Sequence, residues 1–213
     1  MRRKIVKLTA FLAVFSLLAG LWFWRYQAVQ EKYRTYYRTE ESVYYEMGEF
    51  VTMGPCNAYK MRNIEGYSFR VDDYRLVDYS TYLTERNMAD PLAETGQIIP
   101  NKLMLVTLTV RNDDNHVEKD YWTTGFSIHS VDLSGSGLVT SITNDLFLAL
   151  NPELEDSVLF LELGEEVTIT LPYGLNREYF SDWTWHHLKD YQFSISVSEV
   201  NDGHTIRRTV KLH

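Results

Sequence analysis

Residues Lys102 to Arg111 read KLMLVTLTVR and carry the clearest strand pattern in the sequence. Every position from 103 to 110 is apolar or threonine. In an extended chain the odd-numbered side chains would share one face and the even-numbered side chains the other. The polar turn Asn112–Asn115 follows directly. The stretch therefore predicts a β-strand that a turn terminates.

The same alternation recurs on both sides of this strand. The clearer runs are Glu166–Leu171, which we expect Pro172 to end, Gln192–Ser198 and Thr205–Leu212. The weaker candidates are Tyr44–Thr52, Tyr67–Leu76, Gly125–Leu133, Leu138–Thr143 and Val158–Leu163. Turn clusters separate the runs, and Asn201–Gly203 indicates a hairpin. Short strands at such intervals predict an all-β sandwich or barrel in residues 42–213.

The longest region without alternation is Ser80–Pro100. We expect a loop there, with a helical turn near Asp90–Glu94. A loop of this length in a compact domain is functional or mobile. It is therefore one of two regions where we expect contact with a partner.

The front of the chain carries an apolar run. Residues Leu8–Trp24 contain no charge, and the 20 positions Ile5–Trp24 contain only Lys7. About 20 apolar residues in a helix cross a bilayer core. Arg2, Arg3, Lys4 and Lys7 place positive charge before the run, which keeps that end in the cytoplasm. We predict a cytoplasmic tail (1–4), a single transmembrane anchor (5–24) and an extracellular remainder.

A cleaved signal peptide is the alternative interpretation of the same segment. Cleavage requires small residues at both positions of an A-x-A-like site. Ser16–Leu18 and Leu18–Gly20 each place a leucine at one of those positions. An uncleaved anchor is therefore the favoured prediction.

Residues 25–41 are expected to continue the membrane helix as a stalk. They lack glycine and proline, and Tyr26, Tyr33 and Tyr37 recur at helix-compatible intervals. Charge divides at this stalk. Residues 1–38 hold eight basic residues and one acidic residue, a balance of +7, so the remainder carries −15 of the total of −8. An acidic outer part argues against nucleic acid as a partner.

No linear signature of an enzyme, a cofactor site or a metal site occurs in the sequence. His186 and His187 are adjacent, so on a strand they would point to opposite faces. Asn112–Asn115 resembles a calcium loop in composition only. The single Cys56 cannot form an internal disulfide and is interpreted as a partly buried structural thiol. We predict no catalytic, cofactor-binding or metal residues; an enzyme built from scattered loop residues stays an alternative.

The strongest binding candidate is the aromatic segment 179–187. Tyr179, Trp183, Trp185 and His187 form the predicted interaction surface, and in an extended chain the last three would share a face. The alternative places Trp183 or Trp185 in the core of the sandwich, where tryptophan is often buried.

Two segments resemble a known family. NKLMLVTLTVRNDDN (101–115) is similar to the early strand of a bacterial extracytoplasmic immunoglobulin-like family, and LELGEEVTITLPY (161–173) is similar to a later element. Tyr67–Asp78 corresponds to the strand before them. The resemblance covers most of residues 44–200. It implies an immunoglobulin-like β-sandwich on lipoproteins or membrane-anchored surface proteins of Gram-positive cells. Members are largely of unknown function, so it implies no reaction.

Two functions fit these features. The first is a membrane-anchored extracytoplasmic module that binds an envelope protein, a cell-wall polymer or its own copy. The second is an accessory subunit of a membrane transport or secretion complex, in which residues 5–24 and the stalk would make the contacts. The sequence does not define an oligomeric state.

The anchor interpretation predicts that the mature protein keeps its N-terminal segment. N-terminal sequencing of the protein isolated from membranes should start at Met1 or Arg2. A start near Leu21 would show that the segment is a cleaved signal.

Overall fold

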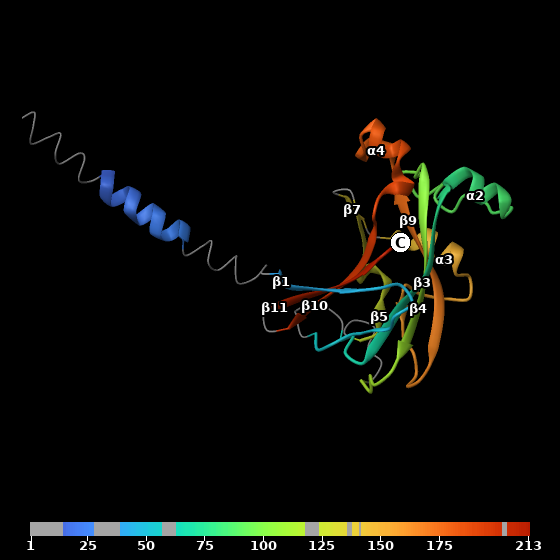
Figure 1. Cartoon of the computed structure of the whole chain (residues 1–213), viewed down its shortest axis with the longest axis horizontal. Helices are drawn as coiled ribbons and strands as arrows, with labels where there is room; N and C mark the ends of the chain where they lie inside the picture. The colour runs from blue at the N-terminus through green and yellow to red at the C-terminus, as the bar shows by residue number, and fades with distance from the viewer. Residues whose placement is uncertain are drawn as a thin grey trace, which may run out of the picture. The chain divides into compact units, whose positions relative to one another are not determined.

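The computed structural model describes residues 15–27, 39–56, 63–117, 124–135, 138–140, 142–201 and 204–213. The chain divides into two compact units, Met1–Arg38 and Thr39–His213. The second unit is the sheet-rich body in Figure 1. The two units are considered separately below.

In the first unit, residues 15–27 form a helix whose side chains are all exposed. Most of them are large and apolar, and Trp22 stacks on Tyr26 with ring centroids 5.5 Å apart. Across the described residues, no helix has both the length and the apolar character that a membrane span needs. Residues 1–14, with half of the predicted anchor, and residues 28–38 of the predicted stalk lie outside the described part.

Two sheets make up the second unit. The five-stranded sheet has the order β1 (Thr39–Tyr45), β11 (His204–Lys211), β10 (Ser194–Asn201), β6 (Val131–Gly135) and β7 (Leu138–Thr140). The four-stranded sheet has the order β2 (Val51–Thr52), β3 (Tyr67–Asp78), β4 (Lys102–Asn112) and β9 (Glu166–Leu175). A small pair joins β5 (Phe126–Ser127) to β8 (Val158–Leu159). The predominance of strands is confirmed, and the arrangement is consistent with a β-sandwich.

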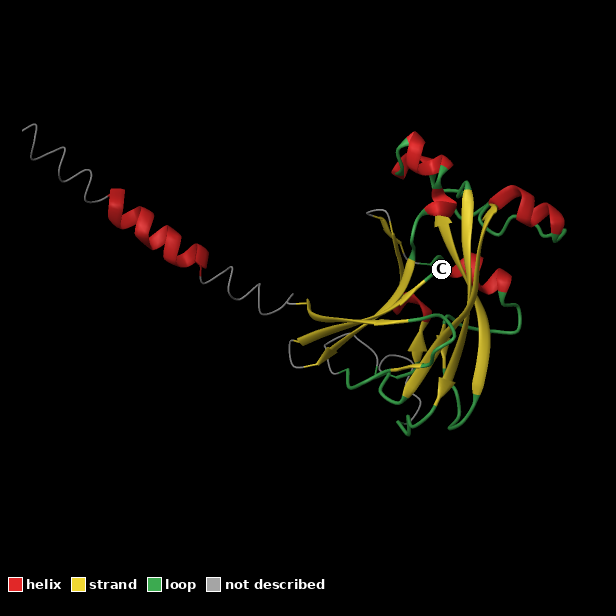
Figure 2. Cartoon of the chain, in the orientation of Figure 1, coloured by secondary structure: helices red, strands yellow, loops and turns green. Residues whose placement is uncertain are grey.

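Short helices connect the strands. They are α2 (Tyr79–Glu85), α3 (Asn144–Leu150), α4 (Asp182–His186) and the 3-10 turns η1 (Ile128–Ser130), η2 (Arg177–Tyr179) and η3 (Leu188–Asp190). Figure 2 shows α2 and α4 at the same end of the sheets.

Strand β4 is apolar on both faces because both faces are buried. Its even-numbered side chains, such as Val106 and Leu108, join the main core, to which Ile195 of β10 also belongs. The odd-numbered Leu103 and Leu105 join a second core with residues of α2 and α3. The four-stranded sheet is therefore covered by β-structure on one side and, over part of the other, by helices.

Strand β1 corrects the predicted end of the stalk. Residues 39–41 were expected to be helical, and they are strand. The reason is tertiary, since β1 pairs in parallel with β11 and gains backbone partners there that the local pattern does not show. Outside this pair the strand ladders run antiparallel, and the pairing Asn201↔His204 confirms the predicted hairpin.

Pro172 does not end its strand, which corrects a second expectation. β9 runs through Pro172 to Leu175 and is the outer strand of its sheet. The N–H of Thr170 points away from β4, because it donates to Oδ1 of Asn151 at 2.7 Å. Two residues further on, Pro172 faces the same way, so its missing N–H removes no bond to β4.

Two predicted strands are divided by turns. Gly48 adopts φ +86°, which favours glycine, and its N–H donates to the carbonyl of Val71, so that Tyr44–Thr52 forms β1 and β2 instead of one strand. Gly125–Leu133 is interrupted by η1, where Ser130 Oγ donates to the carbonyl of Ser127 at 2.6 Å.

The region Ser80–Pro100 begins with a helix and not with the expected loop. Tyr79, Tyr82 and Leu83 are buried on one face of α2, at helical spacing. The Tyr79 hydroxyl donates to Asp90 at 2.5 Å, and the N–H of Leu92 donates to the same carboxylate oxygen. Burial and this aspartate raise the pKa of Tyr79. The hydrogen-bonded turns that follow at 91–95 lie where a helical turn was expected.

A buried ion pair joins the last two strands to the start of the domain. Glu199 of β10 is only 2 % exposed, and it accepts from Nε of Arg208 at 2.6 Å and from the N–H of Gly54 at 2.5 Å. Arg208 also donates to the Tyr45 hydroxyl. Burial alone would lower the pKa of Arg208. The hydrogen bonds to Glu199 and its negative charge have the larger, opposite effect, so the pKa of Arg208 is raised. The pair thus ties β1, β10 and β11 together.

The change Glu199→Gln should lower the free energy of unfolding of the full chain by about 3 kcal/mol, because it leaves Arg208 without its anionic partner. Urea denaturation followed by tryptophan fluorescence measures this loss. The matched control is Arg177→Gln, which removes an exposed pair with Asp182 and should leave the midpoint unchanged. Equal effects of the two variants would contradict a special role for the buried pair.

Candidate binding surface

The aromatic segment is helical where it was expected to be extended. Ser181 accepts from the N–H of Thr184 at 3.1 Å and caps α4. Asp182 in the first turn pairs with Nη2 of Arg177 at 2.9 Å, and the hydrogen bond to this guanidinium lowers the pKa of Asp182. The cap explains why Trp183, Trp185 and His187 do not share one face.

On this helix, Trp183 and His187 are one turn apart and stack. Their ring centroids lie 4.5 Å apart at an interplanar angle of 21°, and Tyr191 meets Trp183 edge-on. Trp183 remains 64 % exposed. Nδ1 of His187 lies 2.7 Å from the carbonyl oxygen of Trp183. The stack therefore presents a fixed, flat apolar side chain to solvent.

Trp185 points elsewhere. It packs against the main core beside Phe180, with ring centroids 5.8 Å apart, and Lys102 Nζ lies 5.6 Å from its ring centroid. Tyr179 is separate from both tryptophans along the chain, at the end of η2, and is 59 % exposed. Of the four predicted residues, Trp183 and His187 form one unit, Trp185 is structural, and Tyr179 belongs to a neighbouring groove.

That groove has a volume of about 570 Å³, within the range of ligand-binding clefts. Its walls come from four segments of the sequence: residues 92–100, strand β7, residues 143–146 at the start of α3, and residues 174–179 at the end of β9 and in η2. The lining residues used below are Ile98, Leu138, Val139, Leu146, Gly174 and Tyr179. Ile98 and Val139 are each 63 % exposed. The lining residues carry no charged side chain.

The loop 96–100 is held at both ends of its apolar part. Gln97 donates from Nε2 to Asp145 of α3 at 2.8 Å. Pro100 packs over Gly174, where an added Cβ would lie 3.1 Å from the Pro100 Cβ. A side chain at this position would require Pro100 to shift by a few tenths of an ångström. Ile98 is thus fixed as one wall of the groove.

A second hollow adjoins the groove. It shares Ile98 and Asn176 with the groove and extends past Ile99 to Asp182, the first residue of α4. In Figure 1, α4 lies beyond the ends of β7 and β9. We call the groove, this hollow and Trp183 the binding surface.

Exposed apolar side chains concentrate at this surface. In the described part of the second unit eight large hydrophobic side chains are exposed. Four of them, Ile98, Ile99, Val139 and Tyr179, line the two hollows, and a fifth, Trp183, follows the lining residue Asp182 in α4. Ile98 and Ile99 lie in Ser80–Pro100, the other region where contact was expected, but the sequence did not single them out, and Val139 was missed. Two adjacent isoleucines in a region without strand alternation indicate an exposed apolar site, so Ile98 and Ile99 could have been recognised. No sequence signal marks Val139, because the other groove residues are distant from it in the chain.

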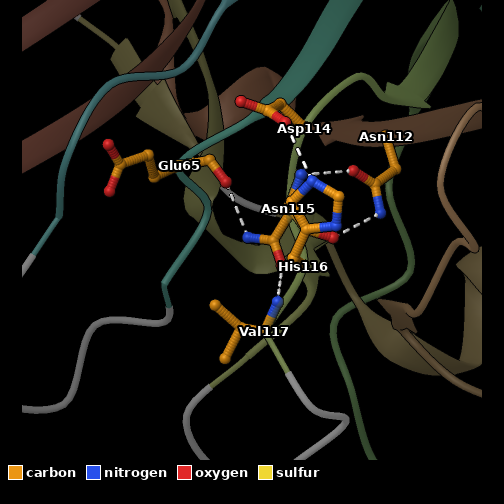
Figure 3. A network of polar contacts seen from close by, with 6 residues as sticks. All are labelled: Glu65, Asn112, Asp114, Asn115, His116 and Val117. Carbon is orange, nitrogen blue, oxygen red and sulfur yellow. Dashed lines mark hydrogen bonds and ion pairs between the residues drawn. The ribbon is translucent and has the colours of Figure 1, made fainter.

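Other chemical candidates are structural. Asn112 is buried, and its side-chain amide binds Asn115 and the carbonyl of Leu161, so that it organises the turn Asn112–Asn115 (Figure 3). Asn115 in turn donates to the carbonyl of Glu65. Cys56 is buried, as expected. Within the residues that the structure describes, no cluster of three or more potential metal ligands occurs.

Comparison with protein families gives one match. Residues 42–200 match the family profile of a domain of unknown function, DUF5028. Comparisons with curated proteins and with solved structures give no match.

The two tryptophans should respond differently to truncation. Trp183→Ala should leave the melting temperature nearly unchanged, because the ring is exposed. Trp185→Ala should lower the free energy of unfolding by about 2 kcal/mol, less than the roughly 3–5 kcal/mol for a fully buried tryptophan. Thermal unfolding of both variants measures the difference. Strong destabilisation by Trp183→Ala would assign that ring to the core.

Proposed function

The chain belongs to the DUF5028 family, whose function is unknown, and we propose that the protein is a membrane-anchored, extracytoplasmic binding module. Residues 5–24 hold it in the cell membrane of a Gram-positive cell, with the N-terminus in the cytoplasm and the β-domain outside. The domain binds another component of the envelope, an envelope protein or a cell-wall polymer, and carries out no reaction.

An immunoglobulin-like fold is supported by the strand order. If β3, β4 and β9 are strands A, B and E, and β6, β10 and β11 are strands C, F and G, then each sheet has the neighbours that this fold requires. The pairs β3–β4, β4–β9, β6–β10 and β10–β11 are all antiparallel. Strand D has no counterpart beside β9 among the described strands.

The membrane anchor is supported by the sequence and by the exposure of the helix. Residues 15–27 expose apolar side chains on all sides. A helix that is apolar all round requires an apolar surrounding. The uncharged run continues toward Leu8, beyond the described residues, and positive charges precede it. The family resemblance of residues 101–115 and 161–173 supports the Gram-positive, extracytoplasmic location.

Binding is supported above all by one observation, the gathering of exposed apolar side chains around an uncharged groove. Contiguous apolar surface on a soluble domain marks an interaction site. In the alternative, an accessory subunit of a transport or secretion complex, residues 5–24 and the stalk would make the contacts. The binding surface would then be free in the cell.

Cysteine footprinting tests the location and the surface together. The only native cysteine is the buried Cys56, so the unchanged chain provides the background. Single Ile98→Cys and Trp183→Cys variants probe the surface, and Tyr44→Cys and Leu163→Cys are matched exposed controls. Each full chain is treated with a membrane-impermeant maleimide in intact cells of the source organism and, separately, after purification in detergent.

We expect the impermeant reagent to label both controls in intact cells at the rate seen for the purified protein. Labelling at positions 98 and 183 should be slower in cells, because a partner covers them. No labelling of either control would overturn the extracellular location. Equal rates in cells and in detergent at all four positions would overturn binding through this surface and favour the alternative.

A further inference from the structure

We propose that the groove binds an extended peptide segment of a partner protein, which adds a strand to the open edge of β9 and has basic residues beside its apolar part. This inference rests on the binding function proposed above and names its partner class. It follows from the backbone of β9, the lining of the groove and the charges around it.

The edge of β9 is closed in one half and open in the other. Asn151 accepts from the N–H of Thr170 at 2.7 Å and donates to its carbonyl at 2.9 Å. A neighbouring strand would make the same two bonds. Residues 172 and 174 face the same edge, since the register between β4 and β9 has no irregularity. Pro172 has no N–H and is buried, whereas Gly174 is half-buried, offers both groups and lines the groove.

Within the described residues, neither backbone group of Gly174 has a hydrogen-bond partner, and no strand pairs with this edge. In the immunoglobulin-like order proposed above, this is the place of the missing strand D. An extended peptide placed there would pair with both backbone groups of Gly174. Strand addition at a free edge is a general mode of peptide recognition, in which backbone bonds give affinity and side-chain pockets give specificity.

The groove supplies such pockets. Alternate side chains of an added strand point to opposite sides. The apolar part of the lining that such side chains would meet comes from Ile98, Leu138, Val139, Leu146 and Tyr179. The lining therefore suits β-branched or other apolar side chains.

Charge around the groove selects the flanks of the peptide. The acidic residues nearest in sequence to the lining are Glu94, Asp145 and Glu178, and all three are exposed. The basic residues equally near are Lys102 and Arg177, and both are paired with carboxylates, those of Asp78 and Asp182. A negative rim around an uncharged groove complements lysine or arginine on either side of an apolar segment.

The test uses the full chain in detergent micelles and the fluorescent peptide KTVTVTVK, followed by polarisation. The comparison probes are ETVTVTVE, a KTVTVTVK with alternate amides N-methylated, and a soluble peptidoglycan fragment. The variants form matched pairs. Ile98→Gln changes the groove, and Leu163→Gln changes an exposed apolar residue that lines neither hollow of the binding surface. Asp145→Asn changes the rim, and Asp114→Asn removes an exposed charge from the loop of Figure 3.

We expect KTVTVTVK to bind and Ile98→Gln to weaken it by about tenfold. Asp145→Asn should weaken it by about threefold at low salt, and the two control variants should change it by less than about twofold. ETVTVTVE should bind more weakly, and the N-methylated peptide should not bind, since its donors are blocked. The variants' unchanged melting temperatures would exclude misfolding.

Three results would overturn the inference. They are binding of the N-methylated peptide as tight as that of its parent, equal effects of Ile98→Gln and Leu163→Gln, and binding of the peptidoglycan fragment when none of the peptides binds. If footprinting protects position 98 in cells while no peptide binds, the strand-addition inference fails and the binding function stands.

Discussion

The structure depends on the burial of both faces of β4. A strand with one apolar face needs one covering layer, but the odd-numbered Leu103 and Leu105 are as apolar as the even-numbered positions and must also leave water. The opposite sheet covers the even face. The odd face is covered by α2, by the turns after it and by α3. Without this apolar face, α2 and α3 would have no apolar surface of the sheet to pack against.

The covering layer also positions the candidate surface. Leu92 and Leu146 pack into the second core and at the same time line the groove. The loop 96–100, which joins Leu92 to β4, is fixed by the packing of Pro100 on Gly174 and by the hydrogen bond from Gln97 to Asp145. The groove therefore lies between rigid elements and does not rely on a loop closing around a ligand. Its shape is a by-product of how the outer face of β4 is buried.

Local patterns predicted the strands well and the surface poorly. Alternation in Lys102–Arg111 and in Gln192–Ser198 depends on neighbouring residues only, so it could be read directly. Tyr79, Tyr82 and Leu83 also formed a helical pattern, but it was too short to outweigh the expectation of a loop. Ser181 was a sequence signal for a helix start, and it would have separated Trp183 from Trp185. The meeting of Ile98, Val139 and Tyr179 depends on chain segments about 40 residues apart, which periodicity cannot relate.

The partial blocking of the β9 edge by Asn151 and Pro172 has a consequence for how the protein behaves at high concentration. A long outer strand with regular donors and acceptors is a template on which identical molecules can stack into polymers. Asn151 occupies part of that template with its own amide, and Pro172 interrupts the row of donors. What stays available is the short stretch at Gly174, which can pair with one peptide but lacks the continuous row of donors and acceptors that repeated stacking of identical molecules needs. Asn151 and Pro172 thus act as gatekeepers against self-association, even where many copies are crowded together.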